Sequence, residues 1–190
     1  MAVPVVALLL AALVGVVVRD HGSTPRPAAS QGSRGEPGEY VTRSPAASAS
    51  GPAPAFDGLT PSKVTDAWAA RWPGPVTEEG ALRTIQVTLP NTKDRLAAAV
   101  GQPSKDRRDE VGHVFCMVKL HGAVKRPLLQ ALVDGCIGPV LGAEERKAVL
   151  NWLVGVDFST PNHQFRQTPG YELLANHNSD ENFALTLNAR

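Results

Sequence analysis

The sequence carries almost no net charge, which limits the partners that the chain can attract. It contains 19 lysine and arginine residues against 18 aspartate and glutamate residues, a formal net charge of +1 at pH 7. A chain with this balance has no overall field that would draw in a polyanion, so we expect no nucleic-acid partner. The most highly charged run, residues 105–110, mixes both signs and is typical of a solvated loop.

Recognisable catalytic and cofactor motifs are also absent. The sequence has no G-x-S-x-G, no phosphate-binding glycine-rich loop, and no histidine or cysteine pair at the close spacing of metal sites. We therefore expect no catalytic residue, no cofactor and no metal, and the sequence does not favour an enzyme. The remaining polar candidates are interpreted as surface-loop residues: His163, His177, Asp157, Asp180 and Glu181.

Cysteine is scarce, and its count bears on the compartment. Cys116 and Cys136 are the only two cysteines in the sequence. In an exported domain such a pair is most simply one disulfide, which requires Cα atoms within about 7 Å of each other. The sequence therefore predicts a Cys116–Cys136 disulfide. Two free thiols are the alternative, and they are expected if the domain lies in the cytoplasm.

Short fragments around the second cysteine resemble the site of the L,D-transpeptidases. They are His121-Gly122 and Gly135-Cys136-Ile137. The resemblance implies a nucleophilic cysteine that an adjacent histidine activates. In this sequence the serine and histidine positions of that site hold Val133 and Asp134. Without the imidazole nothing local would convert the thiol to a thiolate, so we expect no nucleophile here.

What the chain does have is a long apolar segment at its start. No charge occurs from Ala2 to Val18. That length falls between the apolar region of a signal peptide, about 7–15 residues, and a membrane span of about 20. The residues that follow, Arg19–Gly22, fit a cleavage site poorly. We therefore predict that residues 1–20 are an uncleaved anchor that contacts the membrane through residues 2–18, with a cleaved signal segment and secretion as the alternative.

The next segment predicts a flexible connection. Residues 21–58 are rich in proline, alanine, serine and glycine and hold few large apolar residues, so they cannot offset their conformational entropy and are expected to be a disordered linker. Four arginines follow the apolar run and none precedes it, which would place the domain in the cytoplasm. The stalk-like linker and the cysteine pair favour the outside of the cell membrane, and the cytoplasmic orientation stays open. The composition suggests a bacterial protein.

Residues 59–190 are predicted to form one compact extracytoplasmic domain of the α+β class. Alternation of Phe183, Leu185 and Leu187 with polar residues predicts a strand in a C-terminal hairpin that closes an antiparallel sheet. About four helices are expected in total. The expected helices are 61–72, 92–100, 127–134 and 143–153, and the expected strands are 82–89, 111–120, 164–168, 171–176 and 182–188.

Two functional hypotheses follow from this organisation. The first is a membrane-tethered extracytoplasmic domain that binds or scaffolds an unknown protein or other cell-surface partner. The second is a cell-wall or surface hydrolase whose site comes from residues distant in sequence, such as His113 or His121 with a carboxylate. A cleft that holds two titratable groups within hydrogen-bond reach would favour the hydrolase.

Overall fold

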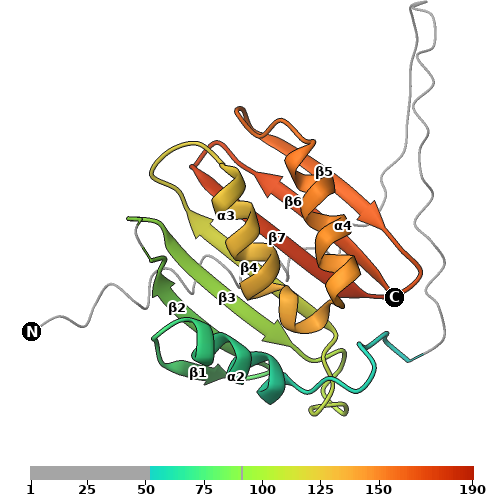
Figure 1. Ribbon diagram of the computed structural model, residues 1–190. Helices are drawn as coiled ribbons and strands as arrows, with labels where there is room; N and C mark the ends of the chain where they lie inside the picture. Colours follow the sequence, from blue (N-terminus) through green and yellow to red (C-terminus); the bar gives the residue numbers. More distant parts are fainter. Residues whose placement is uncertain (1–51, 91) are drawn as a thin grey trace, which may run out of the picture. The chain divides into compact units, whose positions relative to one another are not determined.

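A single antiparallel sheet organises the residues that the structure, a computed structural model, describes: 52–90 and 92–190. Its order is β1-β2-β3-β4-β7-β6-β5, and every neighbouring pair is antiparallel (Figure 1). The strands are β1 (Val76–Glu79), β2 (Leu82–Thr88), β3 (Arg95–Gly101), β4 (His113–Lys119), β5 (Asn162–Gln167), β6 (Tyr171–His177) and β7 (Asn182–Ala189).

Three α-helices lie on one face of this sheet (Figure 1). They are α2 (Pro61–Arg71), α3 (Arg126–Ala131) and α4 (Ala143–Val154), and a π-helical turn η1 (Leu132–Cys136) and a 3-10 turn η2 (Gly138–Val140) lie between α3 and α4.

Local sequence explains where the first helix begins. The hydroxyl of Thr60 accepts a hydrogen bond from the backbone N–H of Lys63 at 3.3 Å, and Pro61 fills the first helical position. A hydroxyl at the cap satisfies a backbone donor that the helix leaves free, and proline needs no partner for its nitrogen there. The prediction of a helix from residue 61 is confirmed.

The core lies between the helices and the sheet. Strand residues that face the helices alternate with residues on the opposite face, so each central strand places every second side chain in the core. Phe183, Leu185 and Leu187 of β7 are fully buried, as their alternation predicted, and Trp68 of α2 is buried with them.

The predicted disulfide is confirmed. Cys116 and Cys136 are bonded, with their Cα atoms 6.2 Å apart. The bond joins β4, in the middle of the sheet, to the last residue of η1. It therefore ties the segment between α3 and α4 to the centre of the core.

The expected helix at residues 92–100 is wrong, because that segment contains β3. Leu96, Ala98 and Val100 are buried, and the residues between them face the other side of the sheet. Alanine favours helix intrinsically, but pairing with β2 on one side and β4 on the other decides the structure. Tertiary context overrides a local preference worth only tenths of a kcal/mol per residue.

Two further expectations need correction. The expected helix at 127–134 stops being α-helical after Ala131 and continues as η1, so the described residues contain three α-helices and not about four. The C-terminal hairpin of β6 and β7 is present, but it does not close the sheet. Strand β7 lies between β4 and β6, and the sheet ends at β5 on that side and at β1 on the other.

The predicted anchor at residues 1–20 and most of the predicted linker at 21–58 lie outside the described residues. Within the described ranges no helix has the length and apolar character needed to cross a bilayer. The anchor, the linker and the orientation of the domain stay predictions.

Candidate functional site

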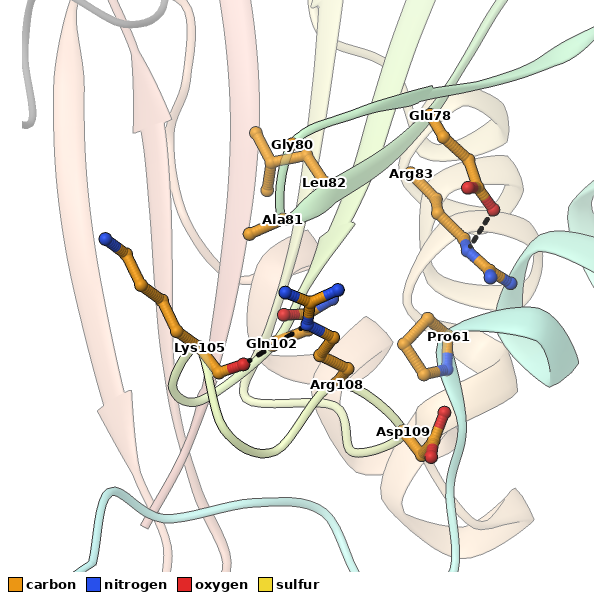
Figure 2. Close-up of a pocket in the computed structure, with 10 residues that line it drawn as sticks. All are labelled: Pro61, Glu78, Gly80, Ala81, Leu82, Arg83, Gln102, Lys105, Arg108 and Asp109. Carbon is orange, nitrogen blue, oxygen red and sulfur yellow. Dashed lines mark hydrogen bonds and ion pairs between the residues drawn. The ribbon is translucent and has the colours of Figure 1, made fainter.

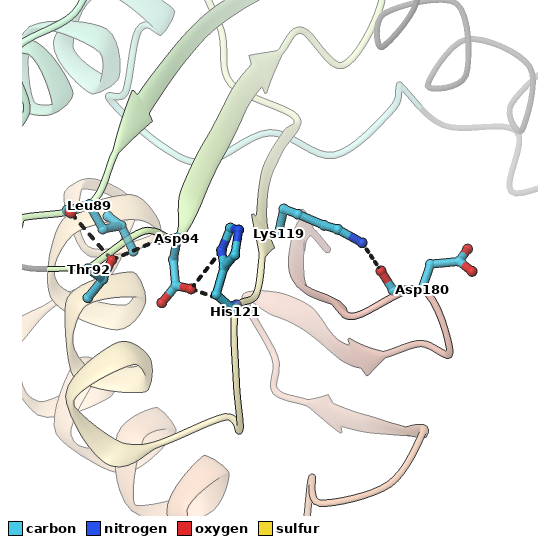
Figure 3. Close-up of polar contacts among 6 residues, drawn as sticks. All are labelled: Leu89, Thr92, Asp94, Lys119, His121 and Asp180. Atoms are coloured by element: carbon cyan, nitrogen blue, oxygen red, sulfur yellow. Dashed lines mark hydrogen bonds and ion pairs between the residues drawn. The ribbon is translucent and has the colours of Figure 1, made fainter.

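The first candidate is the histidine and carboxylate pair that the hydrolase hypothesis required. His121 follows β4 and lies beside Asp94, with 3.6 Å between Nδ1 and the nearer carboxylate oxygen (Figure 3). The same oxygen accepts the backbone N–H of His121 at 2.8 Å. The Thr92 hydroxyl donates to the carbonyl of Leu89 and accepts the N–H of Asp94. These contacts hold the β2–β3 turn against the end of β4, so the Asp94 carboxylate has a structural role, and neither His121 nor Asp94 lines either of the hollows described below.

The other histidines are dispersed. The ring of His113 lies against Gly101 of the neighbouring strand, and burial lowers the pKa of this imidazole below its ordinary value. His163 contacts the ring of Phe165 edge-on, with 6.3 Å between the ring centroids, and His177 lies 3.3 Å from the carbonyl of Thr160. The structure does not bring these rings together. Over the described ranges, no group of three histidine, cysteine or acidic side chains could hold a metal ion.

Cys136 cannot act as the nucleophile of a transpeptidase-like site while it is bonded to Cys116. The carboxylate of Asp134, two residues before it, accepts a hydrogen bond from the side-chain amide of Gln130 at 2.5 Å. The segment that resembled a catalytic block is therefore a structural turn. Its polar neighbours face a hollow described below.

Two surface hollows of similar size remain as candidate sites. The first, which we call the hairpin hollow, has a volume of about 630 Å³ and lies between the β1–β2 hairpin and the loop at 102–110 (Figure 2). Its charges are largely paired or opposed, since Arg83 forms an ion pair with Glu78 at 2.8 Å and Asp109 offsets part of the charge of the loop. Its lining residues are Pro61, Glu78, Gly80, Ala81, Leu82, Arg83, Gln102, Lys105, Arg108 and Asp109.

The second hollow, which we call the basic hollow, has a volume of about 650 Å³ and lies in the helical layer. It combines four cations with a single carboxylate, and no carboxylate of the described residues lies within ion-pair distance of any of the four. Its lining residues are Arg71, Arg126, Gln130, Asp134, Ala143, Arg146, Lys147, Leu150 and Asn151.

Three helices deliver these cations. Arg71 ends α2, Arg126 begins α3, and Arg146 and Lys147 follow the first residues of α4. A cation at the start of a helix, such as Arg126, opposes the macrodipole, which favours negative charge there. Departures from such local preferences are expected at functional sites.

Glycine in the turns between α3 and α4 lets the arginines approach the backbone. A Cβ atom on Gly135 would lie 2.7 Å from Nε of Arg71 and 2.5 Å from the ring of Trp72. A Cβ on Gly138 would lie 3.3 Å from Cδ of Arg146. The two arginines therefore lie against η1 and η2, which contribute Asp134 to the lining of the hollow, and a side chain at Gly135 would displace the first of them.

The segment that contains η1 and η2 is held firmly. Its last π-helical residue, Cys136, is bonded to β4, and the carbonyl of Cys136 accepts the indole N–H of Trp68 at 2.9 Å. The N–H of Ile137 donates to the carbonyl of Leu132 at 3.1 Å. Single π-helical turns inside helices occur frequently at functional sites. The basic hollow thus places its cations beside a turn whose backbone is held by the disulfide and the Trp68 hydrogen bond.

The concentration of charge is local. Four arginines and three acidic residues precede residue 52, which leaves 15 cations and 15 anions in residues 52–190. Against that balance the lining of the basic hollow carries a formal charge of +3. Sequence reasoning missed this hollow because its lining residues are distributed between positions 71 and 151, and the arginines at the end of α2 and the start of α3 were the available signal.

Comparison of the chain with protein-family models, curated proteins and solved structures finds no match. The arguments about function therefore start from the geometry alone.

Proposed function

We propose that this protein is a non-catalytic binding domain, tethered at the outer side of the cell membrane, and that its ligand presents an anionic group to the basic hollow. The observation that carries the proposal is the set of four cations gathered from three helices without a carboxylate partner among the described residues. A hollow that concentrates one sign of charge raises the local concentration of the opposite charge. In a domain of balanced formal charge, this hollow is where an anion is attracted.

The residue types favour phosphate or carboxylate groups. Three of the four cations are arginines, whose planar guanidinium groups match these anions with two parallel hydrogen bonds. The side-chain amides of Gln130 and Asn151 add neutral hydrogen-bonding groups to the wall. A ligand with several anionic oxygens would use more than one arginine at a time.

Binding without catalysis is supported by the composition of the lining. None of its nine residues is histidine, serine, threonine or cysteine, and Asp134 is already hydrogen-bonded to Gln130. The residues present can hold and orient an anion.

The test is a binding titration of the full chain in detergent with inorganic tripolyphosphate, read by calorimetry at an ionic strength of about 0.15 M, where the Debye length is about 8 Å. The double variant Arg71→Gln/Arg126→Gln should weaken binding by roughly 100-fold, since each charged hydrogen bond contributes about 1.5–3 kcal/mol and 1.4 kcal/mol is a factor of ten. Added salt should weaken wild-type binding further.

A matched control makes the same charge change in the hairpin hollow. Lys105→Gln/Arg108→Gln also removes two cations from one hollow and should leave the affinity within a factor of about two, because exposed charges beyond a Debye length are largely screened. Equal losses in both double variants, or no saturable binding by the wild type, would refute the proposal.

The location of the domain has a separate test. The apolar run at residues 2–18, the linker composition and a disulfide typical of oxidising compartments support an outside orientation. Protease added to intact cells that lack an outer barrier should release a folded fragment of about 130 residues, the size of an ordinary domain. A fragment that stays protected until the membrane is broken would place the domain inside.

A further inference from the structure

The two edges of the sheet are built differently. An edge strand presents unpaired backbone groups, and proteins usually protect it by shortness, charge, proline or a bulge. Strand β1 has such protection, because it spans four exposed residues, follows Pro75 and contains Glu78 and Glu79. Strand β5 spans six residues without proline or lysine, its register with β6 runs without a bulge, and its protection is limited to one half-buried charge, Arg166, on the helix-facing side.

The hydrogen-bond pattern shows which backbone groups of β5 point outward. The N–H of Thr168 donates to the carbonyl of Tyr171 at 2.9 Å, so these two residues form a hydrogen-bonded pair. Hydrogen-bonded and non-bonded pairs alternate along an antiparallel ladder. The N–H and C=O groups of His163, Phe165 and Gln167 therefore point away from β6, toward the free edge.

The same residues expose an apolar side chain. Phe165 is 59% exposed, more than any other large hydrophobic residue of the described ranges. It lies on the sheet face opposite the helices. The strand pairings place one residue of each of the next four strands in line with Phe165 on this face. These residues are half-buried and mostly apolar: Leu174, Thr186, Phe115 and Ala99.

We infer that β5 pairs antiparallel with β5 of a second copy of this chain, about a twofold axis at Phe165. In this register Phe165 lies opposite its own counterpart, and Gln164 lies opposite Arg166. His163 then lies opposite Gln167, so all three outward-facing residues of each copy exchange N–H···O=C hydrogen bonds. The two sheets become one, and the two phenylalanine rings meet on the open face.

The charge of the strand permits pairing with a second copy in this register, since no two like charges lie directly opposite each other. Arg166 is the single formally charged residue of β5, and the twofold register sets it against a neutral glutamine. Like charges directly opposite each other destabilise a strand pair, and here there are none. A twofold interface uses the same patch on both subunits, so the β5 edge of each copy suffices.

The experiment measures the mass of the full chain by sedimentation equilibrium in density-matched detergent. The wild type should have twice the mass of the 20.1 kDa chain, and Gln167→Pro should be a monomer at the same concentration. Proline is tolerated in an edge strand where its nitrogen faces outward, so this variant removes pairing groups and leaves the β5–β6 ladder intact. Phe165→Thr, which keeps the backbone unchanged, should shift the equilibrium in the same direction.

Cysteine cross-linking tests the register. Phe165→Cys should form an intermolecular disulfide on mild oxidation, because residues of a hydrogen-bonded antiparallel pair have Cα atoms about 5.5 Å apart. Val76→Cys, on the other edge, should not. A wild-type monomer, a dimer that persists in Gln167→Pro, or cross-linking through residue 76 in place of 165 would each overturn the inference.

Discussion

The two hollows of this domain have nearly equal volumes and differ in how they are built. The basic hollow is formed by residues of three helices beside a turn that a disulfide and a tryptophan hydrogen bond hold in place. The hairpin hollow is formed by an edge hairpin and a loop, and its Arg83 is paired with Glu78. The difference teaches that concavity alone does not identify a binding site. The proposed function rests on a second property, uncompensated charge beside a firmly held turn.

The largest effect is expected from loss of the cross-link beneath the basic hollow. Replacing both Cys116 and Cys136 with alanine releases a loop of 20 residues. The chain-entropy relation gives such a loop about 3 kcal/mol of stabilisation. The free energy of unfolding, measured with urea, should fall by that amount, and the affinity for tripolyphosphate should fall with it. A loss below about 1 kcal/mol would show that the turn holds its shape without the bond.

Glycine substitutions beside each hollow compare the two hollows directly. Gly135→Ala places a Cβ against the ring of Trp72 and Nε of Arg71, so we expect a loss of about 1–3 kcal/mol from overpacking and weaker anion binding. Gly80, in the hairpin hollow, has a φ of 61° and free space around it. Gly80→Ala should cost about 1–2 kcal/mol through backbone strain alone. Binding that changes equally in both variants would remove the distinction between the hollows.

The loop beside the hairpin hollow should respond to acid. A hydrogen bond from the guanidinium of Arg107 lowers the pKa of Glu110 below its ordinary value. Because this pKa is lower in the folded state, the stabilisation is present above the unfolded pKa and is lost as the pH falls through the folded one. The protection factors of the amides in residues 105–110, which correct for the slower intrinsic exchange in acid, should therefore fall as the pH falls, and Glu110→Gln should abolish that dependence. The effect is small because the pair is exposed, and equal acid sensitivity in the variant would contradict it.

The sequence predicted those parts of the fold that local chemistry decides. A threonine cap followed by proline located α2, alternation of apolar residues located β7, and the single cysteine pair located the disulfide. Each signal lies within a few residues or involves two residues with no competing partners. The strand character of residues 95–101 was missed, because it depends on pairing with two strands that the alanine-rich segment does not itself specify.

The basic hollow was beyond sequence reasoning for a related reason. Its cations come from α2, α3 and α4, and no local spacing marks residues that packing brings together. Gly135, which leaves room for the side chain of Arg71, would be interpreted from the sequence as a residue that ends a helix. Its contact with Arg71 and Trp72 depends on the packing of η1 against the end of α2, which the sequence does not specify.

One measurement tests the central claim most directly: titration of the isotope-labelled full chain with inorganic tripolyphosphate, followed by the side-chain amide resonances of glutamine and asparagine. Gln130 and Asn151 line the basic hollow, and Gln102 lines the hairpin hollow, so each hollow carries its own reporter. We expect saturable shifts of the Gln130 and Asn151 resonances and of the Trp72 indole, with Gln102 unchanged. Saturable shifts of Gln102 with Gln130 and Asn151 unchanged would contradict the claim.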